Sequence, residues 1–166
     1  MNLQEKLKIS SMIIDKKSYN AIKLDFKQKF IATTNGKILL KINHDFDINS
    51  NKKDCELFKD KESFVLDAIF LDELIKRMDI GYDIFEVLEK HFNTYQYSNY
   101  LPNIDAINFS YMQAVSSITY NTKTALSVIK VCEKLKMQNI SFNFNSEKNP
   151  TQIKNDVAEI IFMPYV

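Results

Sequence analysis

Glycine and tryptophan are almost missing from this chain of 166 residues, which contains two glycines and no tryptophan. Loops that cradle phosphate groups need several glycines, because their backbone approaches the ligand closely and adopts positive φ angles. The sequence therefore argues against a P-loop or a glycine-rich nucleotide fingerprint, and it contains no nucleophile elbow. We expect a protein that is not an enzyme and that uses no cofactor.

Cysteine is also rare. Cys55 and Cys132 fit neither the spacing of a zinc site nor a disulfide framework. His44, Asp45 and Asp47 stand close together, but no second cluster of similar residues follows, and a solvated loop explains them better than a metal site. We therefore expect no bound metal.

Long apolar runs and a strong charge of either sign are missing too. No run approaches the roughly 20 apolar residues needed to cross a bilayer, and residues 1–6 lack the hydrophobic region of a signal peptide. We expect a cytoplasmic protein with no membrane partner. The formal net charge is +1, so any affinity for nucleic acid has to come from local groups of lysine and arginine.

The first part of the chain predicts a three-stranded meander. Apolar and polar residues alternate over residues 21–26, which is the period of a half-buried strand. Residues 30–33 and 37–42 are read as the next two strands. Asn35-Gly36 between them is a strong hairpin signal, because both residues tolerate positive φ. A weaker helical pattern precedes the meander at residues 3–13.

Two clearer helices follow. Residues 67–79 carry apolar side chains at helical spacing after a short strand at 63–66, and Gly81 suits the end of that helix. Asn121 is a good N-cap for a second helix over residues 122–137. The apolar face that we expect on this second helix consists of Ala125, Val128, Ile129, Cys132 and Leu135.

The remaining segments are read as strands or connections. Residues 44–62 are polar and predict a surface connection. Residues 82–100 fit either a helix or strands, and we favour strands. The C-terminal strands are expected at residues 140–144, 152–154 and 157–163.

The two clear helices begin about 55 positions apart, and the weaker N-terminal helix lies about one interval earlier. We therefore predict a single domain of three units, each with one helix and three strands, at about residues 1–45, 62–105 and 116–166. The expected fold class is α+β, with the helices on one face of an antiparallel sheet.

Several segments resemble, in the same order, the bacterial DNA polymerase III β subunit, the sliding clamp. Residues 32–39 (Ala-Thr-Thr-Asn-Gly-Lys-Ile-Leu) are similar to a strand turn of that family. Residues 64–66 and 71–75 resemble its strand leading into a leucine-rich helix, and residues 100–105 its Tyr-Pro-Asp-Tyr crossover. Residues 120–136 resemble its last helix. Residues 157–166, which include Met163-Pro164, are similar to its last strand and tail.

The resemblance implies a short, divergent clamp of the reduced kind that a phage or mobile element would carry. Clamps are built from such helix-and-strand units, two per domain, with helices lining a central hole and sheets forming the outer wall. Complete bacterial clamps are more than twice as long, and the Leu-Pro that walls their peptide groove is not evident after Asp105. An odd number of units leaves one unpaired, so a closed ring would require a homo-oligomer.

The implied function is that of a processivity factor for DNA replication, which contacts duplex DNA without reading its sequence and tethers a polymerase or another client. Lysines at i, i+7 and i+11 of the second helix form a basic stripe opposite its apolar face, which can contact a phosphate backbone. An ordinary solvated helix face is the alternative. The DNA-binding residues that we expect are Lys123, Lys130 and Lys134, together with Lys76 and Arg77 on the earlier helix. Asp72 and Glu73 offset the positive charge of Lys76 and Arg77.

The family's peptide groove maps onto the C-terminal strand and the first meander. The resemblance implies that Thr33, Leu39, Ile161, Met163 and Pro164 form an apolar pocket for Leu and Phe side chains of client peptides. The alternative is that Ile161 and Met163 fill the core under the sheet and Pro164 ends the strand.

Two other hypotheses remain open. The first is a clamp-fold interaction protein that binds client peptides or a host clamp without encircling DNA, which the short chain and the odd number of units favour. The second is an unrelated α+β structural protein.

Overall fold

The computed structural model describes residues 1–15, 20–46, 62–67, 71–81, 119–144 and 148–164. The strands expected over residues 82–100, the crossover at 100–105 and Cys55 lie outside these ranges.

The described chain forms three helices and seven strands. The helices are α1 (Leu3–Ser11), α3 (Leu71–Asp79) and α5 (Thr122–Lys134). The strands are β1 (Ala21–Asp25), β2 (Phe30–Thr34), β3 (Ile38–Asn43), β4 (Ser63–Asp67), β5 (Ser141–Phe144), β6 (Thr151–Lys154) and β7 (Ala158–Phe162).

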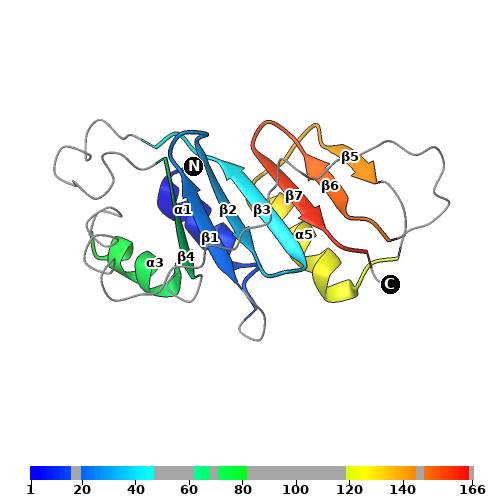
Figure 1. The fold of residues 1–166 in the computed structure, drawn as a ribbon, viewed down its shortest axis with the longest axis horizontal. Helices are drawn as coiled ribbons and strands as arrows, with labels where there is room; N and C mark the ends of the chain where they lie inside the picture. Colours follow the sequence, from blue (N-terminus) through cyan, green and yellow to red (C-terminus); the bar gives the residue numbers. More distant parts are fainter. Residues whose placement is uncertain (16–19, 47–61, 68–70, 82–118, 145–147, 165–166) are drawn as a thin grey trace.

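All seven strands belong to one sheet, in the order β4-β1-β2-β3-β7-β6-β5, as Figure 1 shows from left to right. Every neighbouring pair is antiparallel. The expected mixture of helices with an antiparallel sheet is therefore confirmed. The predicted meander at residues 21–42 is present as β1, β2 and β3.

The helices pack on one face of this sheet. Leu7 of α1 and Leu71 of α3 share a core cluster with Ile22 and Leu24 of β1. A second cluster joins α1 and α5 to the inward residues of β3, β6 and β7. Burial of these aliphatic side chains, each worth about 1.5–3 kcal/mol, is what holds the helical layer to the sheet.

The strand registers reveal an internal repeat with a shift of 120 positions. Ala21 pairs with Thr34 in the first half, and the residues 120 positions later, Ser141 and Lys154, pair in the second half. The β2–β3 and β6–β7 registers match under the same shift. Leu40 and Ile160, which correspond to each other, pair directly across β3 and β7. A local twofold axis therefore passes through this pair and relates α1-β1-β2-β3 to α5-β5-β6-β7.

The predicted middle unit, residues 62–105, is described only as β4 and α3. The 120-residue correspondence relates the first and last predicted units to each other, whereas β4 and α3 add an edge strand and a helix beside the first. The prediction of three units stays a prediction.

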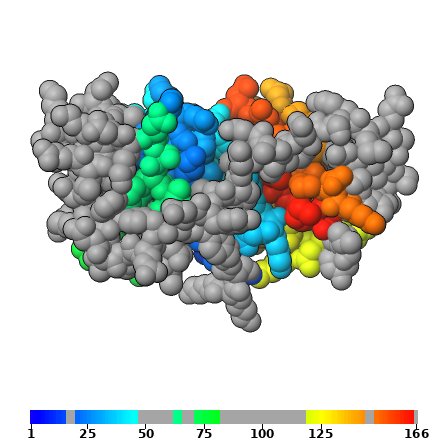
Figure 2. Space-filling model, viewed as in Figure 1, coloured from blue at the N-terminus to red at the C-terminus, as the bar shows by residue number. Residues whose placement is uncertain are grey.

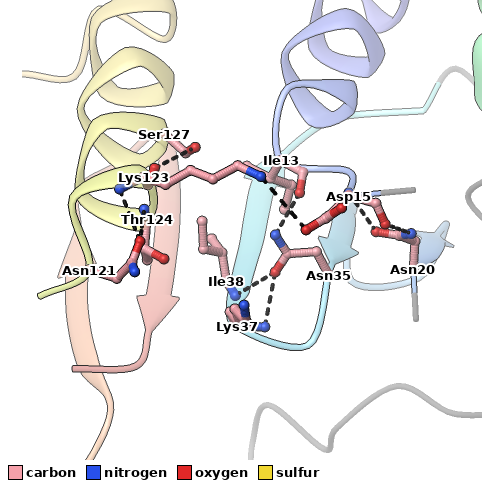
Figure 3. A network of polar contacts seen from close by, with 10 residues as sticks. All are labelled: Ile13, Asp15, Asn20, Asn35, Lys37, Ile38, Asn121, Lys123, Thr124 and Ser127. Carbon is pink, nitrogen blue, oxygen red and sulfur yellow. Dashed lines mark hydrogen bonds and ion pairs between the residues drawn. The ribbon is translucent and has the colours of Figure 1, made fainter. Parts of the chain in front are cut away.

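Corresponding asparagines fix the two halves in the same way. Asn35 Oδ1 accepts hydrogen bonds from the backbone N–H groups of Lys37 and Ile38, and its Nδ2 donates to the carbonyl of Ile13 after α1 at 2.7 Å (Figure 3). In the second half Asn155 Oδ1 accepts from two backbone N–H groups of its own turn, and its Nδ2 donates to the carbonyl of Gln138 after α5 at 3.0 Å. Each asparagine thus ties a hairpin turn to the end of its helix.

The helix boundaries differ from the prediction in two places. Asp67, expected to begin the first clear helix, is the last residue of β4, because it continues the antiparallel pairing with Ala21. The last helix ends at Lys134 instead of residue 137. Lys136 adopts a positive φ, and Met137 donates its N–H back to the carbonyl of Cys132, which is the hydrogen-bond pattern of a Schellman stop.

The predicted apolar face of α5 is also wrong in part. Val128 and Leu135 are buried as expected, but Val131 is buried as well, whereas Ile129 is 51 % exposed. The helix is therefore rotated about its axis relative to the prediction, so that Val131 joins the cluster formed by α1 and the inward residues of β3, β6 and β7.

A half-buried histidine lies where the residues after β3 meet α1. Lys6 Nζ donates to the carbonyl of Asn43 at 2.6 Å and contacts His44 Nδ1 at 3.2 Å. An ammonium group can only donate, so His44 Nδ1 acts as the acceptor and the ring is neutral. Burial and the charge of Lys6 lower the pKa of His44 to about 4, and the carboxylate of Asp45 offsets only part of this effect.

Substitution of the turn asparagines tests the internal repeat. Asn35→Ala removes two accepted hydrogen bonds and one donated bond, and should lower the free energy of unfolding by about 2 kcal/mol. Asn155→Ala should have a similar effect, because its bonds are the same. The longer side chain in Asn35→Gln cannot keep both sets of contacts. This variant should therefore lower the free energy of unfolding by about as much as Asn35→Ala does. Urea denaturation of each variant measures these values, and an unchanged stability in either alanine variant would contradict the shared role.

The low pKa of His44 predicts a pH-dependent stability. An unfolded chain binds a proton at the ordinary pKa of 6.5, but the folded chain binds it only near pH 4. Stability contributed by the neutral ring is complete above pH 6.5 and is lost as the pH falls from 6.5 towards 4. We expect a loss on the order of 1 kcal/mol, because the ring is only half-buried.

The measurement is urea denaturation at about pH 7 and about pH 5, compared with His44→Phe, which keeps a ring beside Phe46 but cannot titrate. The variant should show a smaller loss of stability between these two pH values. Equal losses would show that His44 does not carry the pH dependence.

Candidate nucleic-acid and peptide interfaces

The three lysines predicted on α5 are all exposed on the side of the helix away from the sheet. Asn121 starts the helix by accepting hydrogen bonds from the N–H groups of Lys123 and Thr124, so the position of the stripe along the chain is fixed by this cap. The buried residues Val128, Val131 and Leu135 fix its rotation.

The stripe carries little compensating negative charge. Lys123, whose side chain is 85 % exposed, extends from α5 towards the segment after α1 and lies 3.9 Å from Asp15 (Figure 3). An exposed pair at that distance contributes little energy and leaves the lysine available. Within the described ranges, neither Lys130 nor Lys134 forms an ion pair. Ser127, which interrupts the stripe, donates its hydroxyl to the carbonyl of Lys123.

The other two predicted DNA-binding residues lie on α3, and the helices order along the sheet as α3, α1, α5. Lys76 is exposed, but Arg77 Nε donates to Glu73 at 2.9 Å one turn earlier in the same helix. Asp72 and Asp79 are also on α3. The structure therefore does not gather these two cations with the α5 lysines into one patch, because α1 stands between the two helices.

The residues predicted to bind a peptide are divided between the two faces of the sheet. Leu39 and Ile161 pair directly across β3 and β7 on the face opposite to the three described helices, where they form a small cluster with Phe30 and Ala32. Met163 extends the same row, since its N–H bonds to the carbonyl of Lys37, and its side chain is 39 % exposed. We call Leu39, Ile161 and Met163 the outer strip.

Pro164 and Thr33 are placed differently. Pro164 follows the outer strip and is buried. Thr33 pairs with Ile22 and Leu40, so its side chain faces the helices and is fully buried. Its hydroxyl has no hydrogen-bond partner in the described part of the chain. Thr33 therefore does not join the outer strip, although the alternation along β2 already placed it opposite to Ala32.

Figure 2 views the sheet from the side of the outer strip, where β3 (cyan) and β7 (red) lie next to each other in the middle of the molecule. Lys41, also on this face, places its ammonium 4.4 Å from the centre of the Phe30 ring. The lysine stripe of α5 and the outer strip thus belong to opposite sides of the sheet, so they could be occupied at the same time.

The sequence reasoning missed an apolar cavity beside α5. Its volume is about 490 Å³, and it lies between α5 and the edge strand β5. Its walls include Ala125, Ile129 and Cys132 on the helix and Phe142 and Ile153 on the sheet. Burial raises the pKa of Cys132, so its thiol stays protonated. The sequence did contain a signal for this cavity. Ala125, Ile129 and Cys132 belong to the apolar face predicted for α5, but that face was expected to pack entirely in the core.

The described residues contain no group of three or more His, Cys, Asp or Glu side chains that could hold a metal ion. His44 instead accepts from Lys6, as given above. None of the helices described is long and apolar enough to cross a membrane.

Comparisons of the chain with models of protein families, with curated protein sequences and with solved structures found no match.

Proposed function

We propose that the protein is a sliding-clamp-like accessory factor of DNA replication, which associates with duplex DNA and tethers a polymerase or another client. The observation that carries the proposal is the exposed stripe of Lys123, Lys130 and Lys134 on a helix that stands on the helical face of the sheet. Lysines in such a stripe contact phosphates without reading bases.

The internal repeat supports the clamp-like part of this proposal. Two units of one helix and three antiparallel strands are joined through β3 and β7, with both helices on the same face. This is the arrangement that the resemblance to sliding clamps implied for a single domain, in which helices face DNA and the sheet faces outward. The absence of strong positive charge on α1 and α3 predicts that the association is weak and depends on salt.

A second candidate function is that of an interaction protein which binds client peptides, or a host clamp, without encircling DNA. The outer strip is the observation behind it: Met163 is 39 % exposed at the end of the strip, next to the buried apolar cluster of Leu39 and Ile161. A flexible thioether adapts to Leu and Phe side chains of different peptides. The outer strip lies on the face of the sheet opposite to the α5 lysines, so it could act without any contact of that helix with DNA.

Removal of the lysine stripe tests the association with DNA. The triple variant Lys123→Ala, Lys130→Ala and Lys134→Ala should bind a fluorescent duplex of mixed sequence more weakly. The logarithm of its association constant should also depend less steeply on the logarithm of salt concentration, by about one unit for each lysine that contacts a phosphate. Fluorescence anisotropy over a series of salt concentrations measures both quantities.

The matched control changes three exposed lysines of the sheet turns, Lys27, Lys29 and Lys37, to alanine. This variant loses the same charge, so a general electrostatic effect would appear equally in both. The same salt dependence in the stripe variant and the parent protein would refute the proposed contact.

Substitution of the outer strip tests the second candidate. Met163→Lys should weaken the binding of a short fluorescent peptide with central Leu and Phe residues by about tenfold, because a charge would then stand beside Leu and Phe side chains. Thr33→Val is the control, since Thr33 faces the helices, and it should leave peptide binding unchanged. Equal affinity in the Met163→Lys variant and the parent protein would remove the outer strip as a peptide site.

A further inference from the structure

The apolar cavity between α5 and β5 takes part in neither of the proposed functions. Its volume of about 490 Å³ lies in the range of pockets that hold small molecules. Val128, Ile153 and Phe162 belong to both the cavity wall and the core cluster that joins α5 to the sheet, and none of them is more than 5 % exposed. The cavity is therefore an extension of the core between helix and sheet.

The walls offer little to a polar group inside the cavity. The hydroxyl of Tyr120 is already hydrogen-bonded to Thr151 Oγ1 at 2.6 Å, and the Cys132 thiol stays protonated because burial raises its pKa. In the described part of the chain, the buried side-chain atoms without a hydrogen-bond partner are the hydroxyls of Ser10 and Thr33, and neither residue lines the cavity. A polar group that entered would lose its hydration without gaining a partner, so the part of a ligand that fills this space has to be hydrocarbon.

The charged residues of the wall stand together at the end of α5. They are Glu133 and Lys136, and both are exposed. Residues 130–136 contain three lysines and one glutamate, so positive charge dominates at this end of the cavity. A negative group at the rim is attracted by this charge and also keeps its contact with water.

We propose that the cavity binds a single hydrocarbon chain that ends in a carboxylate, which is the chemistry of a free fatty acid. The chain lies between α5 and β5, and the carboxylate remains at the rim beside Lys136. Apolar cavities hold water poorly and bind apolar molecules instead, and burial of each CH₂ group adds to the affinity. A membrane lipid fits less well, because its two chains would have to share the same space.

A series of chain lengths tests the burial of the hydrocarbon. Octanoate, decanoate and dodecanoate are titrated into the full chain by isothermal calorimetry, at concentrations below those at which they form micelles. The affinity should rise about fourfold for each added CH₂ group, because each is removed from water in the cavity. The same affinity for all three would show that the chain is not buried.

Filling the cavity tests its position. Ala125→Phe places a ring in the space and should weaken the binding of dodecanoate by at least about tenfold. Leu126→Phe is the matched control, since Leu126 is the next residue of α5, is 50 % exposed and does not line the cavity; it should leave the affinity unchanged. Ile129→Asp, at an exposed position of the wall, puts a charge there and should also weaken binding. Circular dichroism of each variant confirms that the fold is kept.

Exchange of the rim charges tests the position of the carboxylate. Lys136→Gln should weaken the binding of dodecanoate and Glu133→Gln should strengthen it, each by about threefold because both residues are exposed. Dodecanol has the same chain without the charge, so it should bind the parent protein and both variants equally. Loss of folding could not produce two effects of opposite sign.

Four outcomes would overturn the proposal. The first is that neither dodecanoate nor dodecanol binds, and the second is that Ala125→Phe binds dodecanoate as tightly as the parent, which would place the chain elsewhere. The third is co-sedimentation with phosphatidylglycerol vesicles that is lost in Ala125→Phe, because a membrane lipid would then be the ligand. The fourth is a dimer in light scattering that disappears in Ala125→Phe, because a second copy would then occupy the cavity.

Discussion

The pairing of β3 with β7 is the contact on which the arrangement of the molecule depends. These strands lie far apart in the sequence, yet they place Leu40 directly opposite Ile160 at the centre of the sheet. Both side chains are buried beneath the helices, in the cluster that includes residues of α1 and α5. Without this pairing, each half would be a small meander with one helix and too little buried surface to be stable alone.

The joined halves are alike in their backbone but differ in how they are completed. In the first half, β4 pairs with β1 and α3 packs beside α1, so the apolar side chains at that end are covered. In the second half, β5 is the last strand of the described sheet, and an apolar cavity lies between it and α5.

The two faces of the sheet have different chemistry. The helical face presents the lysines of α5, which are held in place by the Asn121 cap and the buried side of the helix. The opposite face carries the outer strip, in which Leu39 and Ile161 are buried and Met163 is exposed. A protein that contacts a polyanion on one side and an apolar peptide on the other can connect the two, because neither surface obstructs the other. This separation is the physical basis of the proposed tethering role.

Much of the local structure was determined by the sequence alone. Alternation predicted β1, β2 and β3, the Asn35-Gly36 pair predicted the turn between the last two, and Asn121 predicted the start of α5. These signals come from residues that are close in the chain, where backbone preferences and capping act directly. The exposure of the α5 lysines also followed from spacing, since residues at i, i+7 and i+11 share one side of a helix.

Only the tertiary structure decided which elements meet. On its side away from β2, β3 pairs with a strand about 120 positions away, and neither periodicity nor capping carries information about such a pairing. The same holds for the face of α5 that is buried. Ala125, Ile129 and Val131 are all apolar, but only Val131 joins the core cluster formed with α1, β3, β6 and β7, and Ile129 lies beside the cavity. Thr33 is the opposite case, because strand alternation already indicated the face on which its side chain lies, but the resemblance to sliding clamps implied a groove on the other face. The sequence therefore determined individual strands, helices and turns. Packing between segments far apart in the chain decided which of their side chains form the surface of the protein.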